Sequence, residues 1–190
     1  NILFSNDVFG QHYASEMLYD DMDDISKLIH EAEKYYTNII NPFSTFVTKK
    51  LAEVQGMNLK LDLVAPSHGV IWRKNIGLIM DLYAKWANSY QEDQITLIYD
   101  TMWQSTRKMA EAIAEGIHQA SPNTTIKLLN VVKNDKNDIL VEVFKSKAIL
   151  VGSPTINNGF SYAIAGILEM IKGLKFKNKK AASFGSYGWS

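Results

Sequence analysis

Hydroxyl-bearing residues occupy the loop Thr101-Met102-Trp103-Gln104-Ser105-Thr106, between the apolar stretch Ile95–Tyr99 and a helix expected to begin at Arg107. Backbone N–H groups and the positive end of the helix dipole favour a phosphate at such a position. The loop lacks lysine, and the chain contains neither G-x-x-x-x-G-K-[ST] nor G-x-G-x-x-G, so it has no ATP-type P-loop and no dinucleotide fingerprint. These residues suit a phosphomonoester held by neutral donors. An ordinary N-cap formed by Ser105 or Thr106 would explain them equally well.

Two further loops combine glycines with polar and aromatic residues. Gly152-Ser153-Pro154-Thr155-Ile156-Asn157-Asn158-Gly159 follows one apolar stretch, and Gly185-Ser186-Tyr187-Gly188-Trp189 follows another. Glycines let a backbone approach a flat ligand closely, and three aromatic side chains could lie against a ring system: Trp103, Tyr187 and Trp189. Ordinary turn chemistry accounts for either loop alone. Taken with the hydroxyl loop, they predict a site for a mononucleotide with a flat ring.

An alternation of strands and helices in the second half of the chain would position these loops. The expected strands cover 95–99, 125–132, 148–151 and 180–184, and the expected helices cover 107–119, 138–144 and 162–172. This order predicts a parallel, doubly wound α/β sheet with helices on both faces. Ligands of such sheets bind at the carboxyl ends of the strands, where all three loops would meet.

The first half contains fewer strands. Its periodicity predicts a helix over 22–40 capped by Asp23 or Asp24, and a second helix from Pro42 to Val54 with Gly56 as its C-cap. A short strand over 61–64 and a helix over 75–90 follow. The polar joint over 91–94 is the expected domain boundary.

Asp7 and His68 each follow a short apolar stretch in this half. Imidazole and carboxylate ligands suit iron, zinc or manganese. A turn cap and a simple hydrogen-bonded histidine are the commoner uses of such residues. Nothing in the spacing of the sequence connects the two positions.

Composition excludes several classes of protein. Among 190 residues, 20 basic and 20 acidic side chains cancel, so the net charge gives no reason to expect binding to nucleic acid or an anionic membrane. The chain has no cysteine, which excludes disulfide scaffolds, Cys-ligated zinc or iron–sulfur centres, and a cysteine nucleophile. No apolar run reaches the roughly 18 residues of a membrane span.

The three loops together resemble the FMN loops of the flavodoxin domain in A-type flavoproteins, the flavodiiron proteins. The resemblance implies FMN, with its phosphate on residues 101–106 and its isoalloxazine between the other two loops. The FMN-binding residues would be Thr101, Met102, Trp103, Gln104, Ser105, Thr106, Ser153, Pro154, Thr155, Asn157, Asn158, Gly159, Ser186, Tyr187, Gly188 and Trp189.

The resemblance extends to the first half, where the segments around Asp7 and His68 are similar to two ligand segments of a metallo-β-lactamase-like domain. It implies that Asp7 bridges two irons and that His68 binds one of them. The fold would be the C-terminal part of an αββα domain over 1–92, followed by a flavodoxin-like sheet over 93–190 without its last strand and helix. The family's H-x-E-x-D-H motif is absent, and His12, His30 and His118 do not fill its positions.

The resemblance implies a cytoplasmic oxidoreductase that reduces O2 to water or NO to N2O, with electrons passing from rubredoxin or a similar donor through FMN to iron. It also implies a head-to-tail homodimer. Since Asn1 replaces a starting Met and Ser190 closes a Gly-rich loop, we expect an internal fragment, inactive by itself. Two alternatives remain open: an FMN-binding electron-transfer module with a metal-free sandwich, and a hydrolase using metal-bound hydroxide, for which a flavin has no use.

Overall fold

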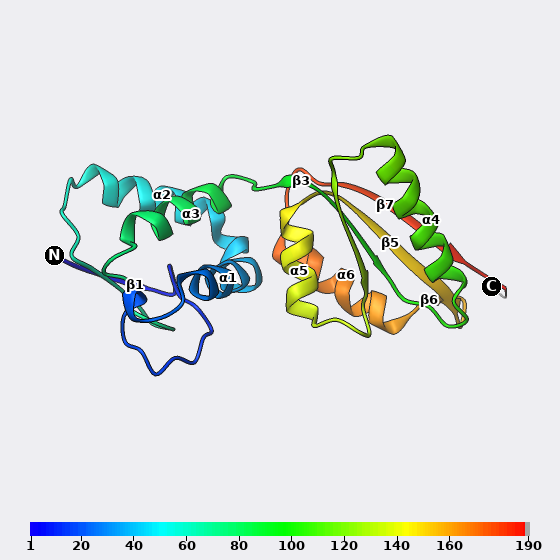
Figure 1. The fold of residues 1–190 in the computed structure, drawn as a ribbon, viewed down its shortest axis with the longest axis horizontal. Helices are drawn as coiled ribbons and strands as arrows, with labels where there is room; N and C mark the ends of the chain where they lie inside the picture. Colours follow the sequence, from blue (N-terminus) through cyan, green and yellow to red (C-terminus); the bar gives the residue numbers. More distant parts are fainter. Residues whose placement is uncertain (189–190) are drawn as a thin grey trace. The chain divides into compact units, whose positions relative to one another are not determined.

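The chain forms two compact units, Asn1–Tyr90 and Gln91–Ser190 (Figure 1). The structure is a computed structural model and describes residues 1–188. The joint lies at the start of the polar stretch over 91–94. Within the described part of the chain, no helix combines the length and apolar character needed to cross a membrane.

The first unit is built on two short parallel strands, β1 (Ile2–Asn6) and β2 (Leu63–Pro66). Ile2 pairs with Leu63 and Phe4 with Ala65, so both strands run toward the same edge. The helices are η1 (Asp20–Met22), α1 (Ile25–Tyr35), the π-helical turn η2 (Tyr36–Ile40), η3 (Asn41–Phe43), α2 (Ser44–Gly56) and α3 (Ile76–Ala87).

Several details of this unit differ from the sequence-based expectations. The helix expected over 22–40 is α-helical only from Ile25 to Tyr35, and it continues as a π-helical turn. Gly56 is the last residue of α2 and not its cap; Asn58, with φ 53°, is the residue in the left-handed region. Asp24 does cap α1, because its carboxylate accepts from Ser26 N at 2.9 Å.

Aromatic side chains fill the core of this unit. The ring of Tyr83 lies 4.8 Å from that of Phe9 and 5.1 Å from that of Tyr36, measured between centroids. Trp72 is fully buried, and its indole N–H donates to Phe9 O at 2.8 Å. The core thus fastens the loop after β1 to the loop after β2.

Asp20 accepts hydrogen bonds from the residues just before α3, although it lies far from that helix in the sequence. Its buried carboxylate accepts from the backbone N–H groups of Arg73 at 2.8 Å, Lys74 at 3.2 Å and Asn75 at 2.8 Å, and from Asn75 Nδ2 at 2.8 Å. Burial raises the pKa of Asp20, but these hydrogen bonds together outweigh burial and leave the pKa below its ordinary value. The ionised carboxylate is therefore the form that stabilises the helix start.

We expect Asp20→Asn to reduce the free energy of unfolding by roughly 1–3 kcal/mol at pH 7, because the partly buried N–H groups lose a charged acceptor. The depressed pKa means that this contribution is present above the unfolded-state pKa and is lost as the pH falls through the folded-state value. Urea unfolding at neutral and acidic pH measures both effects. Asp81→Asn, at an exposed position on α3, is the control; equal losses in the two variants would contradict the capping role.

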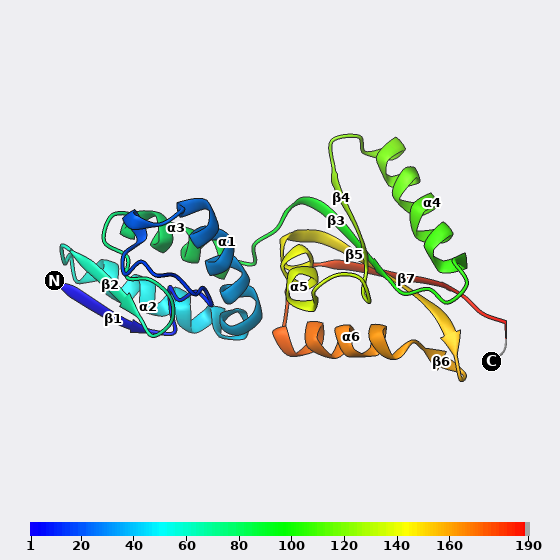
Figure 2. The same ribbon diagram turned by 60° about the horizontal axis from the view of Figure 1, so that its bottom comes forward.

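The second unit is a parallel sheet covered on both faces. Its strands are β3 (Glu92–Tyr99), β4 (Thr125–Asn130), β5 (Ser146–Ile156) and β7 (Lys180–Ser186), in the order β4-β3-β5-β7. Helix α4 (Ser105–Ala120) covers one face, and α5 (Lys136–Lys145) and α6 (Tyr162–Leu174) cover the other (Figure 2). The predicted flavodoxin-like α/β order is confirmed.

A short antiparallel strand, β6 (Gly159–Phe160), pairs back onto the end of β5 and was not expected. Asn157 and Asn158 join the two strands with φ values of 49° and 63°. Two consecutive residues in the left-handed region are the requirement of the tight turn that matches strand twist. The hairpin begins where β5 has passed the last residues that pair with β3 and β7.

The core between the sheet and helices α5 and α6 is aliphatic. Its buried members come from two strands and both helices: Ile98, Ile139, Leu140, Val143, Ile149, Ile167 and Leu174. This packing fixes β3 and β5, two of the three strands whose carboxyl ends carry the loops.

Candidate functional site

Three loops of the second unit converge on one cavity of about 170 Å³. Tyr99 pairs with Gly152 and Gly152 with Phe184, so β3, β5 and β7 end side by side. The residues lining the cavity come from all three strand ends: Thr101, Met102, Trp103, Ser105, Thr106, Pro154, Thr155, Ser186, Tyr187 and Gly188. The convergence expected from the strand order is therefore present.

The first loop leads into α4, and the residue at the N-cap position of this helix does not cap it. Gln104 precedes α4 with φ 68°, and its side chain makes no capping hydrogen bond. Neither Ser105 nor Thr106 is the N-cap, so the ordinary-cap interpretation of these residues is wrong. Among the described residues, no side chain is found to accept from the first N–H groups of α4, and the helix dipole favours an anion at this end.

Thr101 adds a polar atom that lacks a partner. Its Oγ1 is buried and has no hydrogen-bond partner among the described residues, while its backbone N–H donates to Asp100 Oδ1 at 2.8 Å. A buried hydroxyl without a partner costs free energy unless a ligand or water satisfies it. The hydroxyl of Thr106 lies 3.3 Å from Ser186 Oγ and links the first loop to the third. This arrangement fits a phosphate group.

Two aromatic side chains at this cavity are exposed. Trp103 is 81% exposed and Tyr187 is 80% exposed, although both line the cavity. Large exposed aromatic surface beside a polar cavity is the surface that a planar ring can cover. Trp189 lies outside the described residues, and its expected contact with the ring stays a prediction.

Two glycines of these loops, Gly152 and Gly185, are required by the packing of the sheet. A Cβ added to Gly152 would lie 2.4 Å from the ring of Phe184, and one added to Gly185 would lie 2.1 Å from Ser153 O. Close packing of β5 and β7 therefore requires glycine here. Approach to a ligand, the reason inferred from the sequence, is not needed to explain either position.

Some residues expected at the site do not line the cavity: Gln104, Ser153, Asn157, Asn158 and Gly159. The hydroxyl of Ser153 donates to Pro154 O and accepts from Ser161 N, each at 2.9 Å, so it anchors α6. Asn157 and Asn158 form the hairpin turn, and Gly159 begins β6.

The first unit brings Asp7 and His68 together. Asp7 follows β1 and His68 follows β2, and Asp7 Oδ1 lies 3.5 Å from His68 Nε2. Both side chains are about half exposed. The parallel register of β1 and β2, which sequence spacing could not reveal, produces this proximity.

Two further groups lie near this pair: His12, which was set aside on the sequence alone, and Tyr35, which was not singled out. The ring of His12 lies 5.5 Å from that of His68 and 4.7 Å from that of Tyr35, measured between centroids. Burial raises the pKa of Tyr35, and the charge of Asp7 adds to the effect. The short spacing from Asp7 to His12 was the one available signal in the sequence.

Gln11 clamps the two loops that carry Asp7 and His68. Its fully buried side chain accepts from Val70 N at 2.8 Å and donates to Phe9 O at 2.9 Å, while its own N–H donates to His68 O at 3.2 Å. Gly69, with φ 83°, lies against it, and a Cβ there would be 2.0 Å from Gln11 Oε1.

These residues do not fit a resident metal by themselves. No group of three or more His, Cys, Asp or Glu side chains in the described part of the chain is arranged to hold a metal ion. Protein sites for metals such as zinc use at least three protein ligands. Asp7 and His68 are thus at most part of a site.

A family model for flavodoxin matches residues 97–190. The anaerobic nitric oxide reductase flavorubredoxin of Enterobacter sp. (strain 638) is 53% identical over all of this chain, which covers 39% of that protein; the Vibrio vulnificus one is 54% identical, with 38% covered. Rubredoxin oxygen:oxidoreductase from Desulfovibrio gigas superposes over the whole chain with a TM-score of 0.94 at 34% identity, covering 47% of that protein. The Giardia intestinalis flavodiiron protein gives a TM-score of 0.90 at 33% identity, with 46% covered.

This chain belongs to the flavodiiron family. Its second unit is the flavodoxin domain, the FMN-binding type of domain within that family. The chain spans about two fifths of the length of the curated relatives it matches.

We expect Gly69→Ala to destabilise the first unit by roughly 1–3 kcal/mol, because alanine meets both backbone strain and the amide of Gln11. Gly77→Ala is the matched control: Gly77 lies in α3 with no atom near its Cβ position, so alanine there should stabilise by about 0.5–1 kcal/mol. Urea unfolding followed by tryptophan fluorescence measures both. Stabilisation by both substitutions would contradict the conclusion that Gln11 and Gly69 hold the two loops together.

Proposed function

We propose that this chain is the FMN-binding portion, with part of the metal domain, of a flavodiiron oxidoreductase that reduces NO to N2O or O2 to water. The proposed electron donor is rubredoxin or a similar protein, and the proposed assembly is a head-to-tail homodimer in the cytoplasm. Supporting this are the names of the relatives, nitric oxide reductase flavorubredoxin and rubredoxin oxygen:oxidoreductase. The resemblance of the loops and of the Asp7 and His68 segments supports it independently.

The main structural support for FMN binding is the hydroxyl of Thr101, which is buried without a hydrogen-bond partner among the described residues. It lies beside the start of α4, which no N-cap side chain caps. The loop over 101–106 would hold the phosphate through neutral hydroxyl and backbone donors. Pro154, Thr155 and the segment over 186–188 would lie along the ring, with Trp103 and Tyr187 at its sides. Bound FMN supplies one- and two-electron transfer, and the protein supplies its position and surroundings.

Asp7 and His68 would contribute two ligands to the iron centre, Asp7 as the bridging carboxylate. Since the described residues offer too few ligands, further ligands would have to come from outside this chain. The described residues alone also suit the second candidate, an electron-transfer module that binds FMN without metal. Metal analysis of an intact family member carrying this sequence separates the two, because two irons per chain support the reductase and flavin without iron supports the module.

Thr101→Val tests the phosphate assignment. Loss of a hydrogen bond to a charged group should weaken FMN binding by roughly 1.5–3 kcal/mol, about 10- to 160-fold, while riboflavin, which lacks the phosphate, should bind equally to both proteins. Removing an unsatisfied buried hydroxyl should leave stability unchanged or raised. Flavin fluorescence quenching and urea unfolding provide the measurements.

Thr125→Val is the control, because Thr125 is exposed and is the first residue of β4, at the opposite end of the sheet from the three loops. It should leave the affinity for both flavins unchanged. Equal FMN affinity in wild type and Thr101→Val would remove Thr101 from the phosphate site. A parallel loss of FMN and riboflavin affinity would show that the hydroxyl supports the loop and not the phosphate.

A further inference from the structure

Met102 lies in the first loop of the second unit, with its side chain open to solvent. It follows Thr101, lines the cavity of about 170 Å³ between the three loops, and is 40% exposed. An accessible thioether is the methionine group that oxidants attack. The side chain of Met102 therefore meets a small oxidant that enters the cavity when no flavin covers it.

Hydrogen-bond donors beside Met102 lack acceptors. The Oγ1 of Thr101 is buried without a hydrogen-bond partner among the described residues, and Gln104 offers no side-chain acceptor to the start of α4. The sulfur of a thioether is only a weak acceptor, so Met102 in its reduced form does not satisfy these donors. They remain available to an anionic oxygen.

Oxidation would give the side chain of Met102 a strong acceptor of its own. Hydrogen peroxide transfers one oxygen atom to the sulfur: the sulfur loses two electrons as the S–O bond forms, the peroxide O–O bond breaks, and the second oxygen leaves as water. The product, methionine sulfoxide, is polar where the thioether was apolar. Its oxygen accepts hydrogen bonds and donates none, as do the oxygens of an ionised phosphate.

The cavity contains no cation that would offset this change. Among the described residues, those that line it include no lysine, arginine or histidine. A phosphate group there depends on neutral donors alone, so each donor that turns to a sulfoxide oxygen is lost to the phosphate. The partial negative charge of the sulfoxide oxygen would also repel the phosphate.

We propose that Met102 is an oxidant-sensitive modification site that controls flavin occupancy. Its sulfoxide competes with the phosphate of FMN for the donors of the first loop, so peroxide converts the chain to a form that binds FMN weakly. Bound FMN covers the cavity and protects the sulfur. Enzymatic reduction of methionine sulfoxide makes the change reversible. The inference rests on the proposed FMN site.

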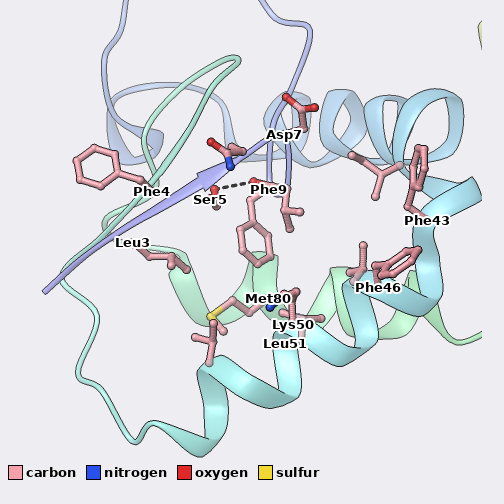
Figure 3. A pocket seen from close by; sticks show the side chains of 15 residues that line it. Leu3, Phe4, Ser5, Asp7, Phe9, Phe43, Phe46, Lys50, Leu51 and Met80 are labelled. Atoms are coloured by element: carbon pink, nitrogen blue, oxygen red, sulfur yellow. Dashed lines mark hydrogen bonds between the residues drawn. The ribbon is translucent and has the colours of Figure 1, made fainter.

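Met80 has a contrasting environment in the first unit. It lines an apolar cavity of about 450 Å³ together with Leu3, Phe9 and Leu51 (Figure 3). A sulfoxide at Met80 would disturb apolar packing and would not compete for the donors of the first loop. Location beside those donors, and not oxidation of methionine as such, is what makes Met102 a control point.

The test treats the flavin-free chain with dilute hydrogen peroxide, locates sulfoxides by peptide mass spectrometry, and titrates FMN and riboflavin before and after treatment. Oxidation of Met102 should weaken FMN binding about 10-fold or more, whereas riboflavin, which lacks the phosphate, should change less than about 3-fold. Methionine sulfoxide reductases should restore the affinity for FMN. Saturating FMN should slow the oxidation of Met102 relative to that of Met57.

Met102→Leu removes the sulfur, so peroxide should change the FMN affinity of this variant less than about 2-fold, whatever that affinity is before treatment. Met57→Leu is the matched control. Met57 is 61% exposed and lies in the first unit, so peroxide should weaken FMN binding by this variant as much as by the wild type.

Unchanged FMN affinity in a chain oxidised at Met102 would overturn the inference alone, as would equal peroxide-induced losses in Met102→Leu and the wild type. Equal losses of FMN and riboflavin affinity would also overturn it, because the sulfoxide would then disturb the whole site and not the phosphate. A chain in which peroxide oxidises Met57 and leaves Met102 unmodified would overturn it as well. Absence of FMN binding before treatment would overturn the proposed function and this inference with it.

Discussion

Parallel pairing of β5 with β3 on one side and β7 on the other is the constraint on which the second unit depends. Tyr99, Gly152 and Phe184 stand in one row, and each of the three strands ends at this row or within four residues beyond it. The pairing is close enough to require glycine at Gly152 and Gly185. Everything at the cavity follows from this row, including the link between Thr106 and Ser186, which are far apart in the sequence.

The first unit applies the same principle with fewer strands. Parallel pairing of β1 and β2 brings Asp7 and His68 to one edge, and the buried amide of Gln11 fixes the two loops relative to each other. Asp20 holds the next segment by gathering three backbone N–H groups at the start of α3. A sheet of two strands can therefore present a well-defined pair of polar side chains.

The sequence was informative where one local pattern decides the outcome. The alternation of apolar strands with amphipathic helices predicted the second unit and placed the hydroxyl loop directly before a helix. It left open whether Ser105 or Thr106 caps that helix, and neither does. The cap formed by Asp24 was likewise predictable from the sequence. Contacts between distant residues were not predictable. The hydrogen bonds of Gln11 depend on a register between strands some sixty residues apart, and the need for glycine at Gly152 depends on the ring of Phe184. The β6 hairpin was not predicted, because the residues of its turn were interpreted as part of a ligand-binding loop.

The central claim is that one cavity at the carboxyl ends of β3, β5 and β7 binds FMN. Backbone amide chemical shifts of the isotope-labelled chain, recorded by NMR while FMN is added up to a stoichiometric excess, test it most directly. The account predicts saturable shifts concentrated over 101–107, at Thr155 and over 186–188, with the first unit unchanged. Shifts concentrated in the first unit, or no saturable shifts with a stoichiometric excess of FMN, would contradict it.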